Sequence, residues 1–259
     1  PNASRTEFQL NVDRLIRLVN AQAFAKSFGE DAAKLLGQGD TKMVGFESQN
    51  TVTNHGKAQS RDSGLISIWI LGQFPPGEET VVIAPYHQGS VDKLGPVVNS
   101  DYFGSIPDDR LVVTPEAVLF LADGNYRSKI GLTPARAKPV VGSIDFKRGV
   151  LTLVHYTLPE DAESQAYVNN TWVLPQPDPF SGDALNSYND GPPEPGAKSL
   201  GGFYELETLS PALELNSGQS VKHVHQTFHI RGPIEQLAKL AELTLGVEIS
   251  KVREAMKLP

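Results

Sequence analysis

Alternation of apolar and polar residues, the pattern of a half-buried β-strand, recurs along most of the chain. It is clearest in segment 220–230, where Val224, Phe228 and Ile230 occupy even positions. The odd positions of the same segment carry His223, His225, Thr227 and His229. Because successive side chains of a strand point to opposite sides, we expect one apolar face and one imidazole-rich face.

Further segments show strand-like patterns, and only two look helical. The predicted strands are 7–13, 43–54, 64–74, 80–85, 117–122, 140–146, 150–158, 167–174 and 203–210. Residues 65–71 are almost all apolar, which predicts a strand buried on both faces. Helices are predicted at 21–36, ending near Gly37, and at 234–245, after Pro233. Many strands and little helix predict an all-β sandwich or barrel with a short inserted helix and a C-terminal helix.

Two turns predict which strands are neighbours. Segment 147–149 would join strands 140–146 and 150–158 as a hairpin. A tight turn at 216–219 would pair the last two strands and set Glu207 opposite His229. The Ser210-Pro211 step is expected to introduce a bulge in that pair.

Composition narrows the classes of partner. The chain has 259 residues, a net charge of −7 and no cysteine, so disulfides and thiolate chemistry are excluded. No basic stripe is available to neutralise nucleic-acid phosphates. No apolar run approaches the roughly 20 residues of a membrane span. We expect a single domain over 1–259.

The strand pattern starts at the first residues, which predicts that opening strands of the sheet precede this chain. The sequence leaves its compartment open. A periplasmic or extracellular location would require a leader ahead of residue 1.

Four interpretations remain open for the histidine-rich face of 220–230. The imidazoles could bind a divalent metal with a carboxylate, or form a polar floor that binds hydroxyl groups. A cupin motif would need a glutamate where His229 stands and a second motif that we do not find. The fourth interpretation is an exposed strand face without function. Glu205 and Glu207 share one face of the preceding predicted strand, so carboxylates are available beside the imidazoles.

Other polar groups add candidate ligand contacts. Arg127 and Lys129 share a face of segment 126–130 and could hold hydroxyls or an anion. The turn 98–104 contains Asp101 and two aromatic residues, which suits a sugar ring. Asn189 and Asp190 lie in the proline- and glycine-rich stretch 175–202. Each of these three groups also has a structural interpretation without function: Arg127 and Lys129 as partners of surface acids, 98–104 as a simple turn, and 175–202 as a solvated connection.

The chain resembles galactose mutarotase-like proteins, in an uncharacterised bacterial branch related to aldose 1-epimerases. The stretches that carry the resemblance are 64–72, 98–104, 126–131, 186–193, 203–208 and 223–229. It implies a β-supersandwich with a sugar cleft on a concave sheet. It also implies that Glu207, in the Leu206-Glu207-Thr208 context, is the general base that acts on an anomeric hydroxyl.

The acid histidine of aldose epimerases has no counterpart after Thr53-Asn54 in this sequence. Our interpretation is therefore a carbohydrate-binding protein that needs no cofactor. The alternatives are an aldose 1-epimerase-like mutarotase with Glu207 as base, and a metal site on the three histidines. The expected sugar-binding set around the candidate base Glu207 is Arg127, Lys129, Asp101, Asn189, Asp190, Glu205, His223, His225 and His229.

Overall fold

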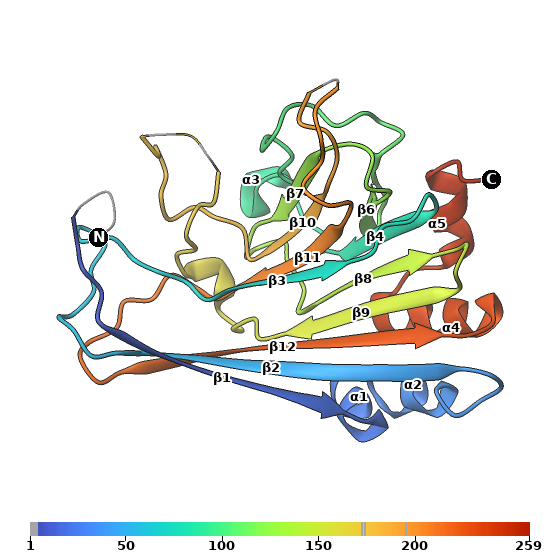
Figure 1. Cartoon of the computed structure of the whole chain (residues 1–259), viewed down its shortest axis with the longest axis horizontal. Helices are drawn as coiled ribbons and strands as arrows, with labels where there is room; N and C mark the ends of the chain where they lie inside the picture. Colours follow the sequence, from blue (N-terminus) through green and yellow to red (C-terminus); the bar gives the residue numbers. More distant parts are fainter. Residues whose placement is uncertain (1–4, 172, 174, 195) are drawn as a thin grey trace.

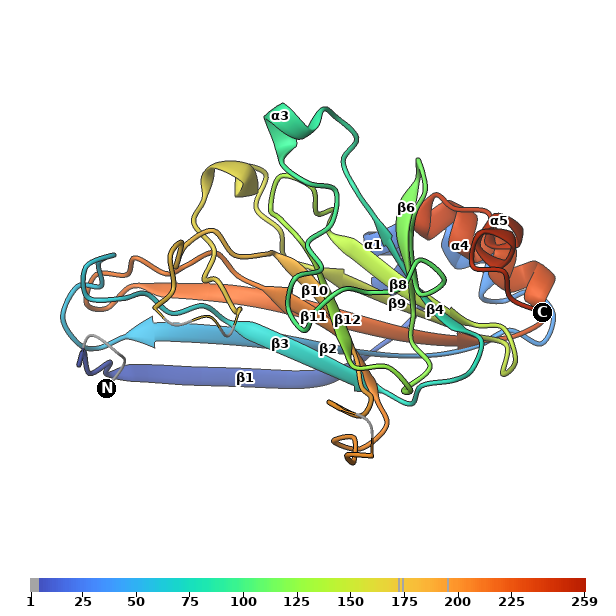
Figure 2. The same cartoon turned by 90° about the horizontal axis from the view of Figure 1, so that it is seen from above.

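The computed structural model describes residues 5–171, 173, 175–194 and 196–259, and these form two antiparallel β-sheets (Figure 1). An eight-stranded sheet and a four-stranded sheet pack face to face, and helices cover the other face of the larger sheet (Figure 2). This architecture confirms the predicted all-β sandwich with helices in the inserted and C-terminal segments.

The large sheet contains the long strands of both chain ends. Its order is β1 (Leu10–Val19), β2 (Lys42–Asn54), β12 (Ser220–Arg231), β9 (Val150–Tyr156), β8 (Val140–Asp145), β4 (Thr80–Pro85), β6 (Ala117–Leu121) and β5 (Leu111–Val113). Strands β8 and β9 form the hairpin predicted through 147–149, with Asp145 opposite Val150. Strand β12 lies between β2 and β9.

The small sheet gathers strands from the middle of the chain. Its order is β3 (Trp69–Phe74), β11 (Tyr204–Leu209), β10 (Leu185–Asn189) and β7 (Ser128–Leu132). One of its faces packs on the large sheet through Ile130, Leu185 and Leu206. The opposite face points away from the large sheet and carries the polar side chains described below.

Because side chains alternate between the two faces of the large sheet, its strands contribute to two hydrophobic cores. On β4, Val82 packs toward the small sheet, whereas its neighbour Ile83 packs toward the helices. The helices that complete the second core are α1 (Ala21–Phe28), α2 (Glu30–Leu35), α4 (Ile234–Leu245) and α5 (Ile249–Ala255). Two short helical segments, α3 (Val91–Leu94) and the 3₁₀ turn Ala162–Ser164, lie in connections.

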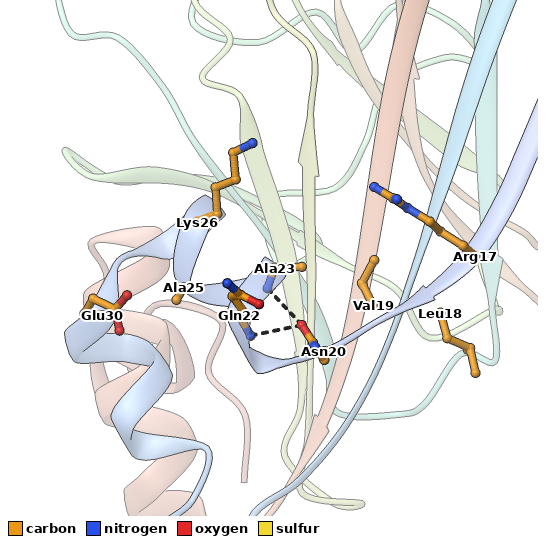
Figure 3. A pocket seen from close by; sticks show the side chains of 9 residues that line it. All are labelled: Arg17, Leu18, Val19, Asn20, Gln22, Ala23, Ala25, Lys26 and Glu30. Atoms are coloured by element: carbon orange, nitrogen blue, oxygen red, sulfur yellow. Dashed lines mark hydrogen bonds between the residues drawn. The ribbon is translucent and has the colours of Figure 1, made fainter.

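The inserted helical segment is divided in two. Gly29 separates α1 from α2 with a φ of 91°, a conformation that glycine adopts easily. At the start of α1, Asn20 Oδ1 accepts hydrogen bonds from the backbone N–H groups of Gln22 and Ala23, at 3.1 and 3.2 Å (Figure 3). A hollow of about 680 Å³ lies at this junction of β1 and α1.

Three expectations about the strands are wrong. Of segment 64–74 only β3 forms a strand, and it lies at the edge of the small sheet with Trp69 and Leu71 partly exposed rather than buried on both faces. The described residues of 167–174 form only an isolated bridge, from Tyr167 to Ser181; residues 172 and 174 lie outside the described part. The predicted connection 175–202 contains strand β10.

The predicted pairing of the last two strands is also wrong. Strand β11 pairs with β3 and β10, whereas β12 belongs to the large sheet. Segment 216–219 therefore connects two sheets and does not close a hairpin. Within the described residues, no helix combines the length and apolar character that a bilayer crossing needs.

Candidate functional site

A cluster of polar side chains lies on the outer face of the small sheet. Alternation turns Leu206 inward and therefore turns Glu205 and Glu207 outward on β11. Strand register then sets Asn186 of β10 beside Glu207, and Tyr188 of β10 beside Glu205. We call the group formed by Trp69, Tyr102, Lys129, Asn186, Glu205 and Glu207 the acidic cluster.

Glu207 is the centre of the acidic cluster. Its side chain is fully buried, and its Oε2 accepts hydrogen bonds from Lys129 Nζ and Trp69 Nε1, each at 2.9 Å. The lysine is also almost fully buried, so this ion pair is shielded from water. The second carboxylate oxygen, Oε1, accepts no hydrogen bond from a described donor. It is a buried acceptor whose hydrogen-bonding capacity no described donor satisfies.

Two aromatic rings enclose the ammonium group of Lys129. Nζ lies 5.0 Å from the centre of the Trp69 ring and 5.2 Å from the centre of the Tyr102 ring. Cation–π attraction and the ion pair both hold the charge in place. Trp69 remains 40% exposed, so part of its ring is open to a ligand.

Glu205 supplies a second carboxyl group on the same face. Its Oε1 accepts a hydrogen bond from Gln73 Nε2 at 2.8 Å. Burial, together with the neighbouring charge of Glu207, raises the pKa of Glu205 to about 7. Near neutral pH the carboxyl group of Glu205 is therefore partly protonated.

A hydrogen-bond network supports the cluster from the side of β7 and β10. Asn186 Nδ2 donates to Tyr102 Oη at 2.9 Å, and Tyr102 in turn donates to Asp183. Asn99 Nδ2 donates to the other oxygen of Asp183 at 2.7 Å. Burial raises the pKa of Asp183 to about 6. The network positions the ring of Tyr102 over Lys129.

The histidines lie on the other side of the small sheet, which corrects the expectation of one shared cleft. Thr208 points inward, and its Oγ1 lies 2.9 Å from His223 Nε2 and 3.0 Å from His225 Nδ1. Both imidazoles are nearly fully buried between the sheets. Burial lowers the pKa of His223 to about 4 and that of His225 to about 3, so both are neutral near pH 7.

His229 is separate from that pair. Its Nδ1 lies 3.0 Å from Thr152 Oγ1, and its ring packs edge-on against Phe74 at 5.2 Å between centres. It borders a cavity of about 210 Å³ beside Tyr204. In the described part of the chain, no three histidine, aspartate or glutamate side chains converge as metal ligands. The proposed three-histidine metal site is therefore wrong.

The other predicted site residues lie outside the acidic cluster. Arg127, just ahead of β7, stacks its guanidinium 4.0 Å from the centre of the Phe103 ring. Asp101 is exposed in the turn beside Tyr102.

Asn189 is buried, and its Nδ2 donates to the carbonyl of Tyr126 at 2.9 Å. Asp190 accepts hydrogen bonds from the backbone N–H groups of Gly201 and Gly202. The last two residues thus hold loops in place.

Sequence reasoning missed several members of the cluster. Trp69 was concealed in an apolar run, and its indole N–H contacts Glu207 only because β3 pairs with β11. Tyr102 and Asn186 lie in segments that we expected to face a sugar, and that expectation was the only sequence signal that pointed to them. Asp183 and Gln73, which hydrogen-bond to members of the cluster, have no such signal in the sequence.

We compared the chain with solved structures. A provisionally assigned aldose 1-epimerase from Escherichia coli K12 aligns over 88% of this chain and 69% of its own, with 10% identity and a TM-score of 0.42. A provisionally assigned mutarotase from Salmonella typhimurium aligns over 87% and 64%, with 10% identity and a TM-score of 0.40. A provisionally assigned aldose 1-epimerase from Klebsiella pneumoniae aligns over 84% and 52%, with 10% identity and a TM-score of 0.44.

The chain thus spans between about half and two-thirds of the length of these structures. The comparison with curated proteins found no match. A family profile, in contrast, matches residues 1–256. The chain belongs to a family of unknown function, DUF6786.

Proposed function

We propose that this chain binds a carbohydrate on the outer face of the small sheet, at the acidic cluster. The observation that carries the proposal is the buried Glu207 carboxylate, held by Lys129 and Trp69 beside the carboxyl group of Glu205. A sugar presents hydroxyl groups that carboxylates bind well and C–H faces that stack on aromatic rings. The partly exposed Trp69 offers ring surface, and Glu207 Oε1, which is buried and has no described donor, offers an acceptor to a hydroxyl group that reaches it.

The second candidate function is aldose 1-epimerase-like catalysis, favoured by the carboxyl pair. The resemblance implies that Glu207 is the base, and Glu205, the second carboxyl group on this face, would then supply the acid. Glu207 would take the proton of the anomeric hydroxyl while Glu205 protonates the ring oxygen, and the bond between C1 and the ring oxygen would break. Rotation of the aldehyde and the reverse proton transfers would give the other anomer and restore both groups.

A glycan array tests binding, with Glu207→Gln as the test variant and Glu214→Gln as the matched control. Glu214 is an exposed carboxylate that pairs with Arg61. We expect specific sugars to be retained by the wild-type chain and by the control, and lost or weakened at least tenfold in Glu207→Gln. Retention of no glycan, or equal retention by both variants, would contradict the proposal.

Exchange spectroscopy by NMR on the sugars retained tests catalysis. If the chain is an epimerase, anomer exchange exceeds the buffer rate and falls by a factor of a hundred or more in Glu207→Gln or Glu205→Gln. If the chain binds sugars but anomer exchange stays at the buffer rate, the catalytic candidate is wrong and the binding proposal stands.

A further inference from the structure

We propose that the ligand is an oligosaccharide, because a second sugar subsite adjoins the acidic cluster. This inference rests on the proposed function and adds the substrate class. The second subsite is a cavity of about 390 Å³ lined by Phe103, Asn125, Tyr126, Arg127, Pro192, Pro193 and Glu194. Its size falls in the usual range of small-molecule sites, roughly 300–1,000 Å³.

The second subsite lies beside the cluster, and three pairs of neighbouring residues connect the two. Tyr102 belongs to the cluster, and the next residue, Phe103, lines the cavity. Arg127, just ahead of β7, is two residues from Lys129, which lies on β7. The ring of Tyr188, opposite Lys129 in the sheet, lies 5.9 Å from the ring of Phe103. A ligand bound at Glu207 can therefore extend toward Arg127.

The walls of the second subsite are fixed by hydrogen bonds and close packing. Tyr126 Oη donates to the Ser105 carbonyl at 3.0 Å, and Asn189 Nδ2 holds the Tyr126 carbonyl from below. Gly191 lies against the backbone of Tyr126 so closely that a Cβ there would come within 2.6 Å of it. Asn189 and Gly191 thus hold the Tyr126 wall of this cavity in place. A preformed wall of this kind lowers the entropy lost on binding.

The lining groups suit a sugar unit. Phe103 and Tyr126 contribute aromatic rings to the lining, Arg127 contributes a planar guanidinium group, and Glu194 contributes a carboxylate acceptor. Arg127 is itself stacked on Phe103, which limits its rotation. Hydroxyl groups that need both donors and acceptors are satisfied by this combination.

Calorimetric titration with glucose, galactose and mannose and with their di- and trisaccharides tests the inference. We expect the best disaccharide to bind at least tenfold more tightly than its monosaccharide. Arg127→Ala and Phe103→Leu should reduce that ratio toward one. Arg61→Ala is the matched control, because Arg61 also stacks on a phenylalanine, Phe180, but lies between β2 and β3; it should keep the ratio.

Amide NMR shifts of the wild-type chain provide a test that needs no variant. Disaccharide should shift the amides of Asn125 and Glu194, whereas monosaccharide should shift those of Glu205 and Glu207 only. Equal affinity for mono- and disaccharide, with no shift at Asn125, would overturn the second subsite and leave the proposed function standing. Binding of no sugar in the panel or on the array would overturn both.

Discussion

The ion pair of Lys129 and Glu207 joins two strands that do not touch each other. Strand β10 separates β7 from β11, and the two long side chains meet above it at 2.9 Å. Both charges are buried, so each depends on the other for its stability. The pair therefore fixes the geometry of the acidic cluster as well as its charge.

Replacing Lys129 by methionine should destabilise the fold by about 3–5 kcal/mol, because it leaves the Glu207 charge buried without its partner. Urea denaturation at pH 7.5 measures the change. Lys147→Met breaks the exposed pair with Glu78 and serves as the control that changes stability little. A Lys129→Met chain as stable as the control would contradict this account.

The buried histidines predict a fall in stability with acid. Their pKa values are depressed in the fold, to about 4 for His223 and about 3 for His225, from a model-peptide value of 6.5. The stabilisation is thus complete above pH 6.5 and is lost progressively as the pH falls from 6.5 through 4 and 3. The slope should approach roughly 1.4 kcal/mol per pH unit for each histidine.

Urea titrations between pH 7 and 4.5 measure that slope. The double variant His223→Gln/His225→Asn keeps polar groups near Thr208 but cannot take up a proton, so its slope should be shallower. The exposed His55→Gln is the control and should keep the wild-type slope. Parallel profiles for the wild type and the double variant would show that these histidines are not buried in neutral form.

At the scale of elements, the small sheet depends on close approach between β7 and β10. Gly131 lies opposite Asn186, and the space where its side chain would be is filled by Asn186 and Asp183. A Cβ at Gly131 would lie 2.6 Å from Asn186 Nδ2 and closer still to Asp183 Oδ2. The absence of a side chain here lets the Asp183–Tyr102–Asn186 network form.

Gly131→Ala should therefore destabilise the chain by about 1–3 kcal/mol and weaken sugar binding, because the network must shift and carries Tyr102 with it. Thermal unfolding and titration with an array-selected glycan measure the two effects. Gly37→Ala is the control, since nothing lies within 4 Å of its Cβ position. If Gly131→Ala behaves like Gly37→Ala, the close approach is not needed.

At the scale of the molecule, the large sheet stabilises two cores at once. Leu237 of α4 is fully buried in the core on the helix side, whereas the small sheet and the acidic cluster lie beyond the other face. A loss of packing under the helices should lower the stability of the whole sandwich, because both cores share the strands of one sheet.

Leu237→Ala should cost about 2–5 kcal/mol, through the lost apolar contact and the cavity left behind. Leu243→Ala, on the same helix but 52% exposed, is the control and should change stability little. Urea unfolding followed by tryptophan fluorescence and by far-UV circular dichroism measures the change. Separate transitions by the two probes would contradict the shared sheet.

The sequence by itself determined the all-β class, most strand positions and the face on which each side chain lies. Glu205 and Glu207 on one face, and the histidines together on another, follow from a period of two residues, which is a local property of the backbone. For the same reason the β8–β9 hairpin, closed by a short turn, was predictable.

Only the tertiary structure decided which strands are neighbours. Lys129 and Glu207 are 78 residues apart, and Trp69 is 138 residues from Glu207. Their contacts depend on β11 joining the small sheet while β12 joins the large one. That choice follows from the packing of two sheets, which alternation within a single strand does not encode. The histidines and the acidic pair were thus recognisable as groups, but their separation by a whole sheet was not.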